Sequence, residues 1–109
     1  MIIIDNEKKN ILLEQYDNDN DMVELIIEDG LVEITEKVNL INNLLNNDSP
    51  DYDTIAIKLH NLKTNAKYLM EEPLAELAKD TEQLIKSANI EENKNGIHSK
   101  INEITKYVM

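Results

Sequence analysis

One histidine of this sequence stands among lysines at helical spacing. His60 is followed by Lys63, Thr64 and Lys67, so all four side chains would share one face of a helix. Residues 54–70 contain three Lys and no acid, in a chain with 22 acids and only 11 basic residues. An accessible imidazole in such a positive region suits covalent attachment of a dianionic phosphoryl group, with a Lys ammonium donating hydrogen bonds to its oxygens.

The same pattern also has an unreactive interpretation. A single histidine at the edge of a helix is usually a surface residue, and lysines at these spacings usually form a solvated face. His98 has no Lys three residues on and is interpreted as a surface histidine. No carboxylates stand at ligand spacing to join His60 and His98 in a metal site, so no metal site is predicted.

Helical segments must position these side chains. Apolar residues recur at helical spacing, Pro50 and Pro73 fit helix starts, and the loop from Glu91 to Asn95, closed by Gly96, separates the last two segments. Ser49 is the expected cap before Pro50, and Gly30 could mark a bend. The predicted helices span about residues 6–16, 21–46, 50–70, 73–89 and 97–108.

Two of these helices carry regular apolar seams. The buried positions expected in the third helix are Ile55, Leu59, Leu62, Ala66 and Leu69. Those expected in the fourth helix are Leu74, Leu77, Thr81, Leu84 and Ala88. Short connections favour antiparallel neighbours. We therefore predict one all-α domain over residues 1–109, an up-down antiparallel bundle with a four-helix core and an additional N-terminal helix.

Composition narrows the classes of function. The net charge of −11 and the absence of Arg argue against a nucleic-acid partner and against binding to an anionic membrane. Without Cys there is no disulfide framework or thiolate nucleophile. The apolar start from Met1 to Ile4 is too short for a signal peptide, and no run approaches 18 apolar residues. A cytoplasmic protein is the expectation.

The segment from Leu59 to Ala66, LHNLKTNA, resembles the signature of histidine-phosphotransfer (HPt) domains, commonly written H-x-L-K-G-S-A. The similarity covers residues 51–89 without a gap, whereas the two preceding helices match only in length and pattern. The resemblance implies that His60 carries a phosphoryl group and that Lys63 stabilises it. It also implies that Glu82, 22 residues after the histidine, hydrogen-bonds the imidazole and orients it. Glu82 follows the seam residue Thr81, so an antiparallel pair of helices could bring the two edges together.

From the resemblance we expect a phosphorelay carrier that exchanges its phosphoryl group with the aspartate of response-regulator receiver domains, or receives it from a sensor histidine kinase. No nucleotide-binding loop is present, so no kinase or hydrolase activity of its own is expected. No cofactor is expected, since Mg²⁺ would belong to the partner receiver domain. The chain is expected to be a monomer. The expected docking surface around His60 consists of Ala56, Ile57, Thr64 and Lys67, completed by an apolar patch from the first two helices.

Two departures from the family pattern keep alternatives open. Thr64 stands where the family usually has a Gly that lets a receiver approach closely, and Met70 stands at a second position often filled by Gly. A degenerate module that docks a receiver or kinase without phosphotransfer therefore remains an alternative. The phosphate-accepting module of a chemotaxis-type kinase is another. Because the sequence ends directly after its last predicted helix, a stand-alone protein or an excised domain is the expectation.

Overall fold

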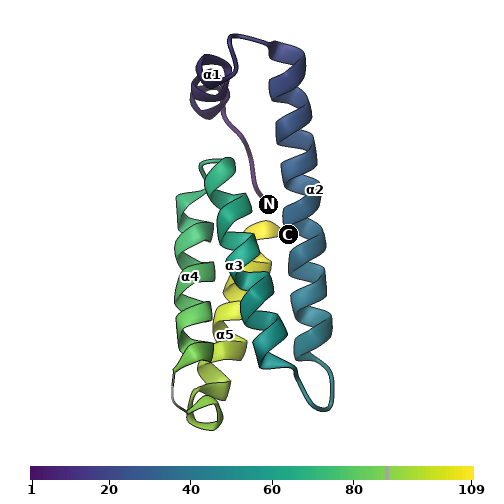
Figure 1. Ribbon diagram of the computed structural model, residues 1–109, viewed down its shortest axis with the longest axis vertical. Helices are drawn as coiled ribbons and strands as arrows, with labels where there is room; N and C mark the ends of the chain where they lie inside the picture. The colour runs from purple at the N-terminus through teal and green to yellow at the C-terminus, as the bar shows by residue number, and fades with distance from the viewer. Residues whose placement is uncertain (88) are drawn as a thin grey trace.

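The chain folds into an all-α bundle, as predicted. The computed structural model describes residues 1–87 and 89–109, and all regular secondary structure in that part is helical (Figure 1). The helices are α1 (Asn6–Gln15), α2 (Asn20–Leu45), α3 (Tyr52–Tyr68), α4 (Glu72–Lys86) and α5 (Ile90–Val108). Helices α2 to α5 run up and down in turn because each connection is short.

Each bundle helix packs against two neighbours. Helix α3 lies between α2 and α4, and α5 lies between α4 and α2. At 26 residues α2 is the longest helix. Its N-terminal end projects beyond the others, and α1 folds back against it (Figure 1). The molecule is accordingly elongated, with extents of 48 × 20 × 20 Å.

The aliphatic core follows the predicted seam of α3 closely, and that of α4 less so. All five predicted positions of α3 are buried. In α4, Leu77 and Leu84 are only partly buried, whereas Ala75, Ala78 and Ile85 are buried. Because α4 packs against both α3 and α5, it buries a wider face than a single seam supplies. Ala88, a predicted seam residue, lies outside the described residues.

The start of α3 differs from the prediction. Asp51 caps the helix, not Ser49: its Oδ1 accepts a hydrogen bond from the Thr54 N–H (3.1 Å) and its Oδ2 one from the Thr54 hydroxyl (2.7 Å). The hydroxyl and backbone hydrogen bonds from Thr54 hold the pKa of the Asp51 carboxyl below its usual value. The helix therefore begins at Tyr52 and leaves Pro50 outside it.

The last helix also begins earlier than predicted, at Ile90 instead of Ile97. Asn89 caps it by accepting a hydrogen bond from the Glu92 N–H (3.3 Å), and acids in the first turn suit the positive end of the helix dipole. The predicted loop over residues 91–96 is wrong because α5 continues through Gly96. A glycine inside a helix costs only about 1 kcal/mol, and Ile90 and Ile97 both pack against the core.

The turn between α3 and α4 sets these two helices antiparallel. Met70 has a left-handed backbone (φ 56°). The Met70 N–H donates to the Lys67 carbonyl (3.0 Å), and the Glu71 N–H donates to the Ala66 carbonyl (2.8 Å), which is the Schellman arrangement at a helix end. A left-handed position favours glycine, and here it is occupied by Met70.

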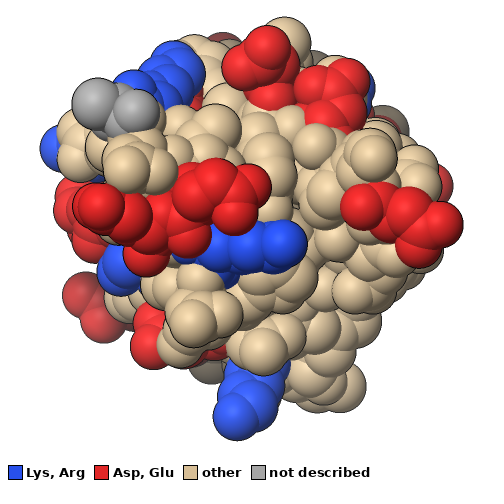
Figure 2. Space-filling model, turned by 90° about the horizontal axis from the view of Figure 1, so that it is seen from below, with Lys and Arg blue, Asp and Glu red and all other residues tan. Residues whose placement is uncertain are grey.

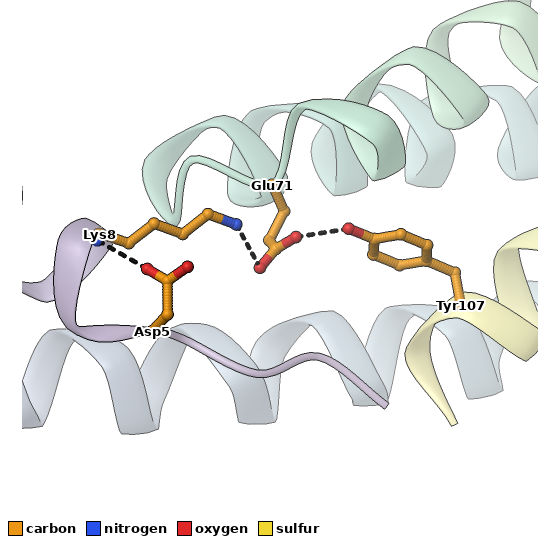
Figure 3. Close-up of polar contacts among 4 residues, drawn as sticks. All are labelled: Asp5, Lys8, Glu71 and Tyr107. Carbon is orange, nitrogen blue, oxygen red and sulfur yellow. Dashed lines mark hydrogen bonds and ion pairs between the residues drawn. The ribbon is translucent and has the colours of Figure 1, made fainter.

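A buried carboxylate ties the N-terminal segment to this end of the bundle (Figure 3). Glu71 is only 3% exposed; its Oε1 lies 2.9 Å from Lys8 Nζ, and its Oε2 accepts a hydrogen bond from the Tyr107 hydroxyl at 2.5 Å. Burial and the contact with Glu71 raise the pKa of Tyr107 to about 12. Asp5 caps α1 through the Lys8 N–H, and the Met1 ammonium donates to the Tyr107 carbonyl (3.1 Å). These contacts link α1, α4 and α5.

The outer surface carries charges of both signs. Seen along the bundle from the end opposite α1, it is mostly uncharged, with groups of acidic side chains and lysines between them (Figure 2). Within the described residues, no helix is long and apolar enough to cross a membrane.

Candidate functional site

The side chains of His60 and Glu82 meet across the contact between α3 and α4. His60 lies eight residues before the end of α3 and Glu82 ten residues after the start of α4, which puts them about 12 and 15 Å from the turn that joins the helices. Leu59 and Leu62 are fully buried on either side of His60 and fix the rotation of α3. The imidazole is therefore held at the edge of the core, with 57% of its side chain exposed.

The two side chains differ sharply in their exposure. Only 9% of the Glu82 side chain is exposed, and its Oε1 lies 3.4 Å from His60 Nδ1. This separation is an ion-pair distance and is longer than a good hydrogen bond. The other ring nitrogen, Nε2, has no hydrogen-bond partner in the part of the chain that the structure describes. One edge of the imidazole thus faces a buried carboxylate, while more than half of the side chain is exposed.

Lys86 belongs to this site and was missed by the sequence analysis. Its Nζ lies 2.8 Å from Glu82 Oε1, the same oxygen that faces His60. The spacing to Glu82 could have identified it, because Lys86 follows Glu82 by four residues and residues four apart on a helix are neighbours. Burial raises the pKa of Glu82, but the hydrogen bond and charge of Lys86, with the charges of His60 and Lys63, outweigh it and hold the pKa below its ordinary value of 4.5.

His60 stands between two open hollows. The first, of about 430 Å³, lies along the groove between α3 and α4. It is lined by Asp53, Ala56, Ile57, His60, Asn61, Glu82, Ile85 and Lys86. The second, of about 470 Å³, is lined by His60, Lys63, Thr64, Lys67 and Tyr68. The imidazole therefore has a mixed apolar and charged hollow on one side and a cationic hollow on the other.

The residues expected to form the docking surface differ in their accessibility. Ile57 is 59% exposed, and Thr64 and Lys67 are exposed as well. The Thr64 hydroxyl donates to the His60 carbonyl (3.2 Å), so it is engaged by the backbone of its own helix. Ala56 was expected at the surface but is only 5% exposed, because α3 packs against two helices and buries a wider face than its seam. Ala56 therefore offers a partner little area.

In residues 1–87 and 89–109, no group of three or more His, Cys, Asp or Glu side chains is placed to hold a metal ion. His98 lies on α5, is partly buried, and lines neither of the two hollows beside His60.

Comparisons of the chain with protein-family models, with curated proteins and with solved structures found no match. The likeness to histidine-phosphotransfer domains therefore rests on the residues between 51 and 89 themselves.

Proposed function

We propose that this protein is a phosphorelay carrier that accepts a phosphoryl group on His60 and exchanges it with the aspartate of receiver domains. The observation that carries the proposal is an exposed imidazole whose Nδ1 faces a nearly buried carboxylate on the neighbouring helix. A histidine that serves only as a solvated surface residue does not need such a partner. A nucleophilic one does, because the partner selects the tautomer and orients the ring.

The chemistry follows from the two ring nitrogens. With its proton on Nδ1 and directed at Glu82, the neutral imidazole has its lone pair on Nε2. That lone pair attacks the phosphorus of a phospho-aspartate, a P–N bond forms, and the P–O bond to the partner aspartate breaks to release its carboxylate. The ring becomes positively charged and keeps the Nδ1 proton. The Glu82 carboxylate, 3.4 Å away, balances that charge.

Lysines on the same face stabilise the transferred group. Lys63 and Lys67 line the cationic hollow beside His60, where their ammonium groups can donate to phosphoryl oxygens. Lys86 sits on the opposite side and is 64% exposed, so it is free to leave Glu82 for the phosphoryl group. Mg²⁺, when present, comes with the receiver's own acidic pocket and supplies charge neutralisation during transfer.

The docking surface centres on the exposed face of α3. Ile57 supplies apolar area beside His60. Exposed apolar residues of α1 and α2 could extend it, namely Ile11, Met22, Leu25, Val32 and Leu40. A protein interface typically combines such an apolar centre with a polar rim.

A docking or inhibitory module without phosphotransfer is the second candidate. Two observations favour it. Thr64 adds a side chain beside His60 where close approach is needed, and Glu82 is closer to Lys86 (2.8 Å) than to His60 (3.4 Å). In that case a receiver would bind without transferring its phosphoryl group.

The direct test is phosphotransfer from receiver domains charged with radiolabelled acetyl phosphate. We expect an acid-labile, alkali-stable label on the wild type, none on His60→Gln, and an undiminished label on the matched control His98→Gln. Label that persists on His60→Gln would overturn the assignment. Binding of a receiver with no label on the wild type would establish the docking module instead.

A further inference from the structure

A separate hollow lies at the other end of α3, where α1, α2 and α3 come together. It has a volume of about 290 Å³. Its lining residues are Tyr16, Ile26, Asp29, Gly30, Glu33, Asn65, Tyr68 and Leu69. Gly30 makes the close approach of α3 possible, since a Cβ there would lie 3.0 Å from Leu69 Cδ1.

The lining combines an apolar floor, two aromatic rings and two carboxylates. Ile26 and Leu69 supply the floor, and Tyr68, which is 65% exposed, stands at the edge. Asp29 and Glu33 are exposed and four residues apart on α2, so they lie on one face. No lysine lines the hollow, and neither acid forms an ion pair within the described residues.

Such a lining matches an arginine or lysine side chain. An aliphatic stem packs on apolar surface while its charged head stays near the rim. The head gains from the faces of aromatic rings and from carboxylates placed around it. An uncharged apolar side chain would leave the two acids unused, and an anionic one would be repelled by them.

The hollow adjoins the site of His60. Tyr68 lines both this hollow and the cationic hollow that holds His60, Lys63 and Lys67. His60 and Tyr68 are eight residues apart, about 12 Å along α3. The charges change sign over this distance: residues 54–70 hold three Lys and no acid, whereas residues 16–36 hold eight acids and no Lys.

We propose that this hollow is a recognition subsite for a cationic side chain of the docked partner, and that it fixes the partner's orientation on α3. Where the docked partner is a receiver domain, this inference rests on the proposed function. A receiver would present its acidic phosphorylation pocket to His60 and its lysines, and an arginine or lysine about 12 Å away to Asp29 and Glu33. A partner turned around on α3 would meet like charges at both places, which disfavours that orientation.

The subsite can be tested without any receiver. N-acetyl-argininamide is titrated into the ¹⁵N-labelled protein, with the uncharged analogue N-acetyl-citrullinamide as the ligand control. We expect saturable shifts centred on the amides of Gly30 and Leu69 and on Tyr68, and none with the citrulline analogue. Asp29→Asn with Glu33→Gln should weaken binding at least tenfold. Glu28→Gln with Glu36→Gln removes the same charge from exposed positions of α2 outside the hollow and should change binding less than twofold.

Equal shifts with both ligands, or equal losses with both variant pairs, would overturn the subsite. Phosphotransfer separates this inference from the proposed function. Binding of argininamide in the hollow with no label on His60 would leave the subsite standing and the carrier function wrong. Label on His60 with no binding of argininamide in the hollow would leave the carrier function standing and overturn the subsite. If both stand, Asp29→Asn with Glu33→Gln should slow labelling by a receiver at least fivefold relative to the control pair.

Discussion

Two glutamates, Glu71 at the N-cap of α4 and Glu82 within it, are nearly buried, and they are held in opposite ways. Glu71 at the start of the helix is 3% exposed and Glu82, eleven residues later, is 7% exposed. Each oxygen of Glu71 has its own partner, Lys8 at 2.9 Å and the Tyr107 hydroxyl at 2.5 Å. In Glu82 a single oxygen faces both Lys86 at 2.8 Å and His60 at 3.4 Å.

The partners also differ in their exposure to solvent. Lys8 has 26% of its side chain exposed and Tyr107 is partly buried, and both come from distant parts of the chain. His60 and Lys86 have 57% and 64% of their side chains exposed. A buried carboxylate whose partners are themselves buried or partly buried holds elements together, whereas one whose partners are exposed to solvent is accessible to a reactant. Glu71 therefore serves the fold, and under the proposed function Glu82 serves the chemistry of His60.

The largest expected effect on stability comes from Glu71→Ala. It leaves the Lys8 ammonium and the Tyr107 hydroxyl without their partner and should lower the free energy of unfolding by about 2 kcal/mol. Urea unfolding measures this change. Labelling of His60 in the folded variant should stay within twofold of wild type. A variant as stable as wild type that had lost labelling would reverse the roles assigned to the two glutamates.

Glu82→Ala should show the opposite pattern. Loss of the group that orients the imidazole should slow labelling of His60 roughly 10- to 100-fold, by analogy with other residues that orient a reactive histidine. The free energy of unfolding should change by no more than about 1 kcal/mol, because the partners of Glu82 are exposed. Glu82→Gln, which retains a hydrogen-bond acceptor, should restore most of the labelling rate. Equal rates for wild type and Glu82→Ala would remove Glu82 from the site.

Lys86→Met tests how the charge of Glu82 is maintained. The pKa of Glu82 is lowered in the folded state, so its ionised form contributes stability that is present above its unfolded pKa and is lost as the pH falls through the folded value. Removing Lys86 should raise the pKa of Glu82 because burial remains. The variant should be less stable by up to about 1 kcal/mol at neutral pH. The difference in stability between wild type and Lys86→Met should shrink as the pH falls below 4.5, the ordinary pKa of a glutamate. A difference in urea unfolding that does not change with pH would contradict this.

The smallest expected effect comes from Gly96→Ala, which touches neither glutamate. Alanine is favoured over glycine inside a helix by about 1 kcal/mol. The new Cβ would lie 3.3 Å from Leu84 Cδ2, the end of a movable side chain. A gain of about 0.5 kcal/mol is expected in urea unfolding, with labelling of His60 unchanged. A loss of stability would show that Leu84 cannot adjust.

The fold was largely predictable because local signals agree with one another. Apolar spacing defined the seam of α3, and the same seam fixed His60 at the edge of the core. The start of α5 was predicted wrongly because Gly96 and the polar run before it favour a loop, whereas the cap at Asn89 and the apolar anchor Ile90 carry the helix through them.

The site was predictable only in part, because a sequence pattern reveals contacts within a helix or between adjacent helices but not contacts between segments far apart in the chain. His60, Lys63 and Glu82 lie on two adjacent helices, and Lys86 could have been found from its spacing to Glu82. The partners of Glu71 are 63 and 36 residues away, and no local pattern indicates them. The hollow beside Tyr68 likewise needs three helices brought together in space.

In the proposed mechanism, Glu82 holds the proton on Nδ1 of His60 so that Nε2 reacts. This role of Glu82 is tested most directly by ¹⁵N and ³¹P NMR of the imidazole rings before and after treatment with phosphoramidate, a small phosphoryl donor that needs no receiver. We predict a proton on Nδ1 of His60 beforehand, phosphohistidine on its Nε2 afterwards, and a much slower reaction in Glu82→Ala. Phosphorylation on Nδ1, or equal reaction of His60 and His98, would contradict the account.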